Sequence, residues 1–128
     1  MNDHDLATHY RGYINCLNGQ DWPNLGRFVH ENVQRNGEQL GLSGYVAMLQ
    51  KNYEDIPDLV FKIELLISAP PTVGCRLRFD CTPKGELFGL PVNGRKVSFA
   101  ENVFYEFDTG KIKLVWSVID KAAIEAQL

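Results

Sequence analysis

The fold is decided by residues 89–120, which read GLPVNGRKVSFAENVFYEFDTGKIKLVWSVID. Apolar and polar side chains alternate between residues 96 and 107, and one phase holds Val97, Phe99, Val103, Tyr105 and Phe107. A period of two over twelve residues is typical of a long strand with one buried face. Turn residues at 108–110 separate it from a second alternating run, which predicts a long antiparallel hairpin. A hairpin cannot bury its apolar face alone, so other elements must cover it.

Glu101 is the exception in this pattern, because it falls in phase with the apolar set. A carboxylate at a core-facing position costs free energy unless it is paired, hydrogen-bonded or protonated. Glu101 is therefore a candidate for acid/base chemistry. The alternative is that it lies at the open end of the sheet and is simply in contact with water.

The composition is that of an ordinary globular chain, and 128 residues predict a single domain over residues 1–128. A formal net charge of -3 without a basic cluster argues against a nucleic-acid partner, since phosphate binding needs concentrated Lys and Arg. The first residues contain no cationic and apolar leader, and no apolar run approaches the roughly 18 residues that a membrane span needs. We therefore expect a cytoplasmic protein without a membrane partner.

The cysteines, Cys16, Cys75 and Cys81, are odd in number and do not have metal or redox spacing. We interpret them as small buried hydrophobic residues in a reducing compartment. The sequence contains no metal-ligand motif and no Gly-rich phosphate loop after a strand. The expected site therefore uses neither a metal nor a cofactor.

Helical spacing dominates the N-terminal part of the chain. Residues 5–18 predict an amphipathic helix that ends at Asn18-Gly19, with an apolar face made by Leu6, Tyr10, Tyr13, Ile14 and Leu17. A short helix through Phe28 follows, because Asp21 can cap it and Pro23 is tolerated in a first turn.

A short strand at residues 32–35 and a turn at Asn36-Gly37 come next. Residues 43–55 predict a third helix, which Pro57 ends. One face of this helix carries Tyr45, Met48, Leu49, Asn52, Tyr53 and Ile56.

Strands take over after residue 58. One run places Phe61, Ile63, Leu65 and Ile67 in a single phase, and residues 73–81 alternate in the same way. The tail, residues 121–128, has helical composition but is too short to stand alone. Helices first and antiparallel strands afterwards predict an α+β domain, in which the N-terminal helices pack on the concave face of a curved, cone-shaped sheet. A pocket is expected between the helices and the sheet.

Six short segments and one tryptophan together resemble the SnoaL-like polyketide cyclase and ester cyclase family. They are NG at 36–37, GLSGY at 41–45, IPDL at 56–59, GELFGLP at 85–91, GRKV at 94–97, FDTGKI at 107–112, and Trp116. They follow the family's order over nearly the whole chain. The resemblance implies the cone-shaped fold of nuclear transport factor two and ketosteroid isomerase, also called cystatin-like. It further implies a small-molecule pocket and a homodimer packed through the outer face of the sheet.

The resemblance also implies a reaction, an intramolecular aldol closure of a keto or polycyclic substrate without metal or cofactor. Characterised cyclases of this kind use a carboxylate just after the Trp position of the last strand, helped by a His on the preceding strand. The matching residues here are Ser117 and Val103, and Pro83 stands where many relatives have a second His. Glu101 and Asp120 then remain as the acidic candidates near the pocket strands.

The face that carries Asp120 depends on the hairpin turn. A two-residue turn puts Glu101 and Asp120 on one face with Trp116. A three-residue turn with a bulge instead puts Glu101 opposite Ser117 and sends Trp116 to the other face. The sequence leaves both possibilities open.

Several other side chains are candidates for ligand contact. Tyr10 and Tyr13 are possible phenolic donors, as in ketosteroid isomerase-like sites, or aromatic residues of the core or its rim. Asn36 is a possible partner for a substrate carbonyl, or a turn residue with a structural role. The expected pocket lining is completed by Val103, Trp116 and Ser117.

Three functions are compatible with these features. The first is a cofactor-independent cyclase or isomerase in which Glu101 or Asp120 acts as acid and base. The second is a non-catalytic small-molecule-binding domain on the same fold, and the third is an oligomerisation module. The contents of the predicted pocket distinguish them.

Overall fold

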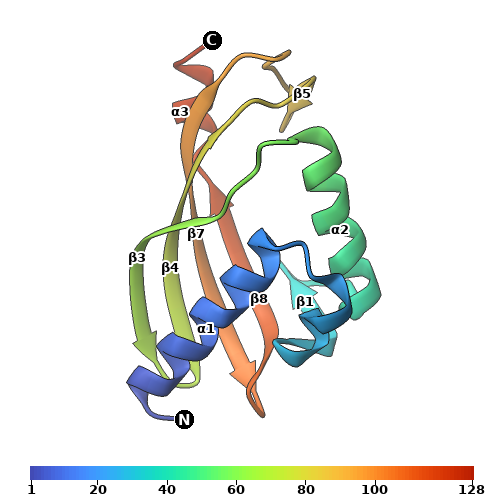
Figure 1. Ribbon diagram of the computed structural model, residues 1–128. Coiled ribbons are helices and arrows are strands. Elements are labelled where there is room, and N and C mark those ends of the chain that lie inside the picture. The colour runs from blue at the N-terminus through green and yellow to red at the C-terminus, as the bar shows by residue number, and fades with distance from the viewer.

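A six-stranded mixed sheet forms the body of the computed structural model, which describes residues 1–128 (Figure 1). Its strands lie in the order β2, β1, β8, β7, β4, β3. Their bounds are β1 Val29–Arg35, β2 Glu38–Gln39, β3 Lys62–Ala69, β4 Thr72–Cys81, β7 Val97–Asp108 and β8 Lys111–Ile119. A separate two-stranded hairpin consists of β5 Glu86–Leu87 and β6 Leu90–Pro91. The helices are α1 Asp3–Asn18, the 3-10 helix η1 Trp22–Arg27, α2 Gly41–Asp55 and α3 Lys121–Glu125.

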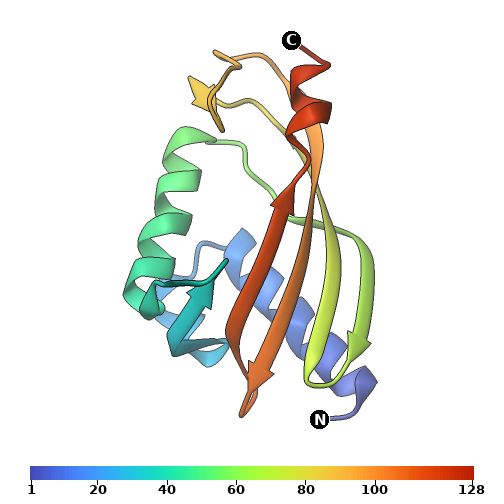
Figure 2. The ribbon, with the colours of Figure 1, turned by 180° about the vertical axis from the view of Figure 1, so that it is seen from behind.

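The sheet combines antiparallel and parallel pairs. Strands β3, β4, β7 and β8 form an antiparallel meander, whereas β1 runs parallel to β8 at the other side. Helices α1 and α2 lie on the concave side, and Figure 2 shows the strands from the opposite, uncovered side. The predicted α+β fold, a curved mixed sheet with the N-terminal helices on its concave face, is confirmed.

Helix α1 covers the part of the concave face nearest the chain's N-terminus. It begins where the Asn2 side chain accepts a hydrogen bond from the Asp5 backbone N–H. Tyr10 and Tyr13 on its inner face pack against Tyr105 of β7, with ring centroids 5.0 and 5.8 Å apart. Fully burying a large apolar side chain contributes roughly 1.5–3 kcal/mol, so this aromatic face helps to hold α1 on the sheet. No helix of the chain is both long and apolar enough to traverse a membrane.

The hairpin turn answers the question of register that the sequence left open. Thr109 and Gly110 form a two-residue turn with φ of 51° and 79°, as expected for a type I′ hairpin. A bulge follows at once, because Phe107 pairs with Ile112 while Glu106 pairs with Leu114. Beyond the extra residue, each side chain of β8 lies on the opposite face of the sheet from the one that unbroken alternation would give. The two-residue turn was therefore a correct possibility, but the placement of Trp116 on the face of Glu101 is wrong.

Strand β3 contains a second bulge that the alternating pattern did not reveal. Register shifts between Ile63 and Leu65, so one residue is left without a direct partner on β4. Leu65 and Ile67, placed in a single phase with Phe61 and Ile63, are 55% and 60% exposed. The single phase does not hold along β3, because the inserted residue moves every later side chain to the other face.

Two small elements close the end of the sheet that lies away from the N-terminus (Figure 1). The β5–β6 hairpin, which the sequence did not predict, turns at Phe88 and Gly89, both with positive φ. The C-terminal tail forms α3, where Ile124 is fully buried. The tail is thus helical because it docks on the core.

Asn18 at the end of α1 holds the chain that enters β3. Its side-chain amide donates to the Phe61 carbonyl oxygen at 2.9 Å and its side-chain oxygen accepts from the Phe61 N–H at 2.8 Å. We expect Asn18→Ala to lower the free energy of unfolding by about 1–2 kcal/mol, because two hydrogen bonds to backbone groups are lost. Thermal denaturation would show this as a fall of several degrees in Tm.

Asn24→Ala is the matched control, because Asn24 bonds only the exposed Asp21 side chain. Its effect should stay within about 0.5 kcal/mol. Equal destabilisation by the two variants would contradict the role given to Asn18.

Candidate functional site

A cavity of about 170 Å³ lies between α2, the concave face of the sheet and the β5–β6 hairpin. Its apolar walls are formed by Met48, Ile56, Leu59, Phe61, Phe79, Leu87, Phe88, Phe99 and Ile119. Its three polar lining residues are Arg35, Asn52 and Glu101. An apolar hollow with a few convergent polar groups is typical of a small-molecule site.

A narrower crevice of about 40 Å³ adjoins this cavity and reaches deeper between α1 and the sheet. The two spaces share five lining residues, Arg35, Met48, Asn52, Phe61 and Glu101. The three polar residues therefore border both spaces. We call this group, Arg35, Asn52 and Glu101, the polar cluster.

Glu101 projects from the middle of β7, and its side chain is 15% exposed. Its Oε2 atom accepts a hydrogen bond from Ser117 Oγ of β8 and lies 3.6 Å from Arg35 Nη2 of β1. Oε1 has no hydrogen-bond partner in the protein and is not sealed from the cavity. The carboxylate thus has one anchored oxygen and one oxygen left for a ligand.

Burial raises the pKa of Glu101 above that of an ordinary glutamate, because removal from water disfavours the charged form. The Ser117 hydrogen bond and the Arg35 guanidinium oppose this effect and lower the pKa, but burial prevails. A carboxyl group with a raised pKa both accepts and returns protons more readily near neutral pH. Glu101, which shares the phase of the apolar residues in the predicted strand, thus lines the cavity.

Arg35 and Asn52 were not among the predicted site residues. Arg35 of β1 pairs with Val115 of the parallel strand β8. It lies two residues after buried Val33 and therefore faces the same side of the sheet. Both residues fall within the short strand that the sequence predicted. Asn52 is the polar interruption in the apolar face of α2. Like Glu101, each of these two residues is a polar side chain at a position where the periodic pattern has apolar neighbours. This exception is harder to recognise in a short strand or in a helix than in a long strand.

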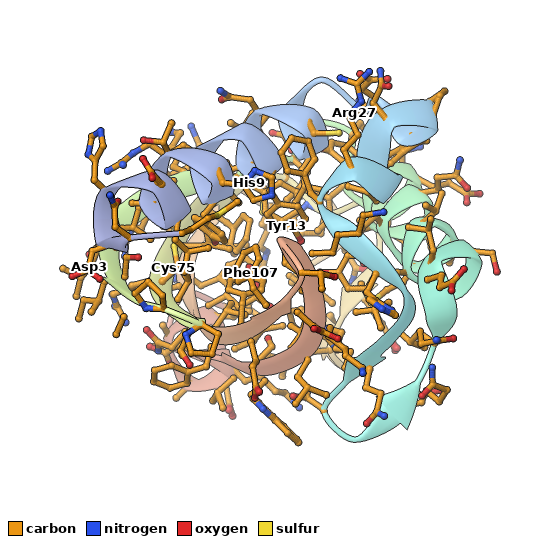
Figure 3. The ribbon with its side chains drawn as sticks, turned by 90° about the horizontal axis from the view of Figure 1, so that it is seen from below. Asp3, His9, Tyr13, Arg27, Cys75 and Phe107 are labelled. Atoms are coloured by element: carbon orange, nitrogen blue, oxygen red, sulfur yellow. The ribbon has the colours of Figure 1, made fainter.

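The tyrosines predicted as donors belong to a buried group of phenols. Tyr13 Oη lies 2.7 Å from Tyr45 Oη, and Tyr10 donates to Tyr105 at 3.2 Å. Figure 3 shows Tyr13 pointing from α1 toward the curved strands. Tyr13 lines the inner crevice with Tyr45 and Tyr105, whereas Tyr10 lines neither space. Burial raises the pKa of Tyr45 to about 12 and holds the pKa of Tyr13 well above its ordinary value, so these phenols remain neutral near pH 7.

Asn36 supports Ser117 from the end of β1. Its side-chain oxygen accepts from the Ser117 N–H at 2.8 Å, and its amide donates to the Ser117 carbonyl at 3.3 Å. These bonds use the polar atoms of Asn36 on the β8 backbone, and Asn36 does not line the cavity. Its contact with a ligand carbonyl, expected from the sequence, is therefore replaced by a structural role next to Ser117.

The remaining predicted residues lie in different places. Val103 lines the inner crevice and pairs with Ser117 across the hairpin. Trp116 is on the convex face, 48% exposed, because of the bulge in β8. Asp120 caps α3, where its side chain accepts from the Ala123 N–H at 3.1 Å. The structure therefore does not bring Asp120 or Trp116 to the cavity.

Other features of the surface do not compete with this site. A wider depression between α1 and η1, of about 660 Å³, is shallow and has only two hydrophobic lining residues of nine. No group of three or more His, Cys, Asp and Glu side chains is placed to hold a metal ion. The three cysteines are unpaired and buried.

Solved structures resemble this chain along nearly its full length. A SnoaL-like polyketide cyclase from Agrobacterium tumefaciens strain C58 is 52% identical, with a TM-score of 0.94, and covers 95% of this chain and 96% of its own. IdmH from Streptomyces antibioticus is 17% identical, with a TM-score of 0.81 and coverage of 95% and 96%. TsrD from Streptomyces laurentii is 19% identical, with a TM-score of 0.79 and coverage of 97% and 92%. The last two similarities show the fold alone.

The family comparison agrees with the fold and the cavity. No curated protein sequence matches this chain. The family model described as SnoaL-like polyketide cyclase matches residues 7–128. The chain therefore belongs to the SnoaL-like polyketide cyclase family.

Proposed function

We propose that this protein is a cofactor-independent cyclase or isomerase that moves a proton at the carbon next to a substrate carbonyl, with Glu101 as base and acid. The observation that carries the proposal is that Glu101 is the only carboxylate among the residues lining the apolar cavity and its inner crevice. Its raised pKa and its unbonded Oε1 suit a group that takes up a proton and gives it back.

The chemistry needs no group beyond the chain's own side chains. Glu101 Oε1 takes the proton from the α-carbon, and the electron pair of that C–H bond moves onto the carbonyl oxygen as an enolate. In a closure, the enolate carbon then attacks a second carbonyl carbon of the same molecule, and the resulting alkoxide takes the proton back from Glu101. In an isomerisation, the proton returns to a different carbon. Arg35 and Ser117 hold the carboxyl group in position throughout.

Proton abstraction can be measured without knowing the natural substrate. We expect the protein to accelerate exchange of the α-hydrogens of 2-tetralone for deuterium in D₂O, observed by NMR. Glu101→Gln should reduce the protein-dependent exchange rate by about 100-fold or more, because a positioned general base is typically worth 10²–10⁴ in rate.

Glu106→Gln is the matched control, because Glu106 lies on the same strand and points to solvent. It should keep the wild-type rate. Equal exchange by the wild type and Glu101→Gln would rule out Glu101 as the base.

The pH dependence of stability gives an independent test. The raised folded-state pKa of Glu101 means that the folded protein binds this proton more tightly than the unfolded chain. The carboxyl group therefore contributes stability below the unfolded pKa, and this contribution is lost as pH rises through the folded pKa. We expect Glu101→Gln to raise Tm relative to wild type by an amount that grows from pH 4 toward pH 7. A direct NMR titration of Glu101 near the unperturbed value of ~4.3 would contradict this.

A binding function without turnover is the second candidate. It is favoured by Val103 and Ser117, which stand where the resemblance implies the catalytic His and carboxylate, and by the anchoring of Glu101 Oε2. Saturable binding of 2-tetralone without deuterium exchange would support this second candidate.

We also propose a homodimer that forms through the convex face of the sheet. Phe104 pairs directly with Trp116, and Leu65, Ile67 and Val118 lie on the same uncovered face. Their exposures of 48–70% make a contiguous apolar surface, which is unusual for a monomer. A second copy of the chain suits it, because a two-fold axis lets one apolar patch cover itself.

The dimer can be tested with two matched substitutions. Val118→Asp places a charge within the patch, where we expect it to shift the protein to monomer in sedimentation or light-scattering measurements. Val60→Asp introduces the same change at an exposed valine in the loop before β3 and should leave the dimer intact. A monomeric wild type at micromolar concentration would refute the proposal.

We also propose that residues 1–128 form one domain and that the protein is cytoplasmic. A single hydrophobic core cluster of 30 residues, with members from Leu6 to Ile124, supports one domain over residues 1–128. The three unpaired, buried cysteines support a reducing compartment, which we take to be the cytoplasm.

A further inference from the structure

The size and polarity of the cavity limit what it can hold. At about 170 Å³ it lies below the 300–1,000 Å³ of pockets for drug-sized ligands, and close to an apolar cavity of about 150 Å³ that accepts benzene. The adjoining crevice adds about 40 Å³. The hollow is partly open to solvent, and the volume within it matches one or two rings, so that the rest of a larger polycyclic compound would lie outside the apolar walls.

The walls and the polar cluster divide the cavity into two unlike ends. Phe61, Phe79, Phe88 and Phe99 supply aromatic surface around the main space. The polar cluster borders the passage to the inner crevice. A ligand that fills both regions is flat and apolar at one end and carries a polar atom at the other.

Within the polar cluster, the side-chain amide of Asn52 is unbonded, as is Glu101 Oε1. Glu101 Oε2 is shared between Ser117 and Arg35, whereas the Asn52 amide bonds no other protein group. The Asn52 side chain is half-buried at the cavity wall, so its amide is accessible to a molecule in the cavity. A ligand oxygen is a suitable partner, because the side-chain NH₂ of Asn52 is a donor.

We infer that the cavity binds a one- or two-ring carbonyl compound whose oxygen is held by the amide of Asn52 while its α-carbon faces Glu101. This inference rests on the proposed function, since it identifies the substrate class of the same site. Asn52 is then the donor that receives the negative charge developing on the carbonyl oxygen as Glu101 removes the proton. Asn52 of α2 thus holds the carbonyl oxygen, and Glu101 of β7 moves the proton.

Binding can be measured by calorimetry with three probes. These are 2-tetralone, a two-ring ketone; tetralin, the same framework without the oxygen; and testosterone, a four-ring ketone. We expect 2-tetralone and tetralin to bind and testosterone to bind at least tenfold more weakly than 2-tetralone. Testosterone affinity equal to that of 2-tetralone would overturn the size limit.

Asn52→Leu is the decisive variant, because it keeps the side-chain volume and removes the donor. It should weaken 2-tetralone binding about tenfold, as expected for one hydrogen bond, and leave tetralin binding unchanged or tighter. Retained tetralin binding shows that the variant is folded. Gln50→Leu, at an exposed position of the same helix, is the matched control and should change neither affinity.

The outcomes separate this inference from the proposed function. Wild-type affinity of Asn52→Leu for 2-tetralone would overturn the role of Asn52, even if deuterium exchange is intact. Glu101→Gln should reduce exchange by about 100-fold or more, and its effect on 2-tetralone affinity should be smaller than that of Asn52→Leu. Loss of binding in Glu101→Gln, with Asn52→Leu unaffected, would assign the ligand oxygen to Glu101 instead. Tight, Asn52-dependent binding without exchange would support the ligand class and reject only the catalytic proposal.

Discussion

The structure depends on the contact between the aromatic face of α1 and the concave surface of the sheet. Tyr10 and Tyr13 meet Tyr105 there, with both α1 residues almost completely buried. Because a curved sheet with one apolar face must be covered, this contact supplies burial that the hairpin alone lacks. Helix α1 is too short to cover the whole face, so the remaining part lies under α2 and the β5–β6 hairpin (Figure 1). The cavity is the part of the concave surface that side chains do not fill.

Placing the Glu101 carboxylate in that cavity costs desolvation free energy. Its carboxylate contacts Ser117 of β8 and Arg35 of β1, and Asn36, in the turn after β1, bonds the Ser117 backbone. They compensate only part of the desolvation, because the pKa of Glu101 stays raised. A site intended only for stability would carry an apolar residue at this position, as the neighbouring Phe99 and Val103 do. Such a local conflict with the folding pattern is expected at functional sites.

The two bulges determine which side chains of β3 and β8 face the concave side of the sheet and which face the convex side. In β8 the bulge turns Ser117 toward Glu101 and Trp116 outward, and in β3 it turns Leu65 and Ile67 outward. The concave face thereby gains a hydrogen-bond donor for the carboxylate. The convex face gains Leu65 and Ile67 from β3 and Trp116 and Val118 from β8, on the same face as Phe104 of β7. A shift of one residue therefore connects the geometry of the site with the surface proposed for dimerisation.

The sequence by itself determined the helices, the long hairpin, the α+β class and the unusual position of Glu101. These follow from local periodicity, that is, from the spacing of apolar and polar residues along the chain. Only the tertiary structure decided that Asp120 caps α3, that Asn36 bonds the β8 backbone and that Arg35 and Asn52 join Glu101. Bulges leave no clear mark in an alternating pattern, because a single unpaired residue reverses the facing without changing composition. The partners of Glu101 come from segments up to 66 positions away in the chain, from Arg35 to Glu101, and such contacts exist only after the sheet has closed.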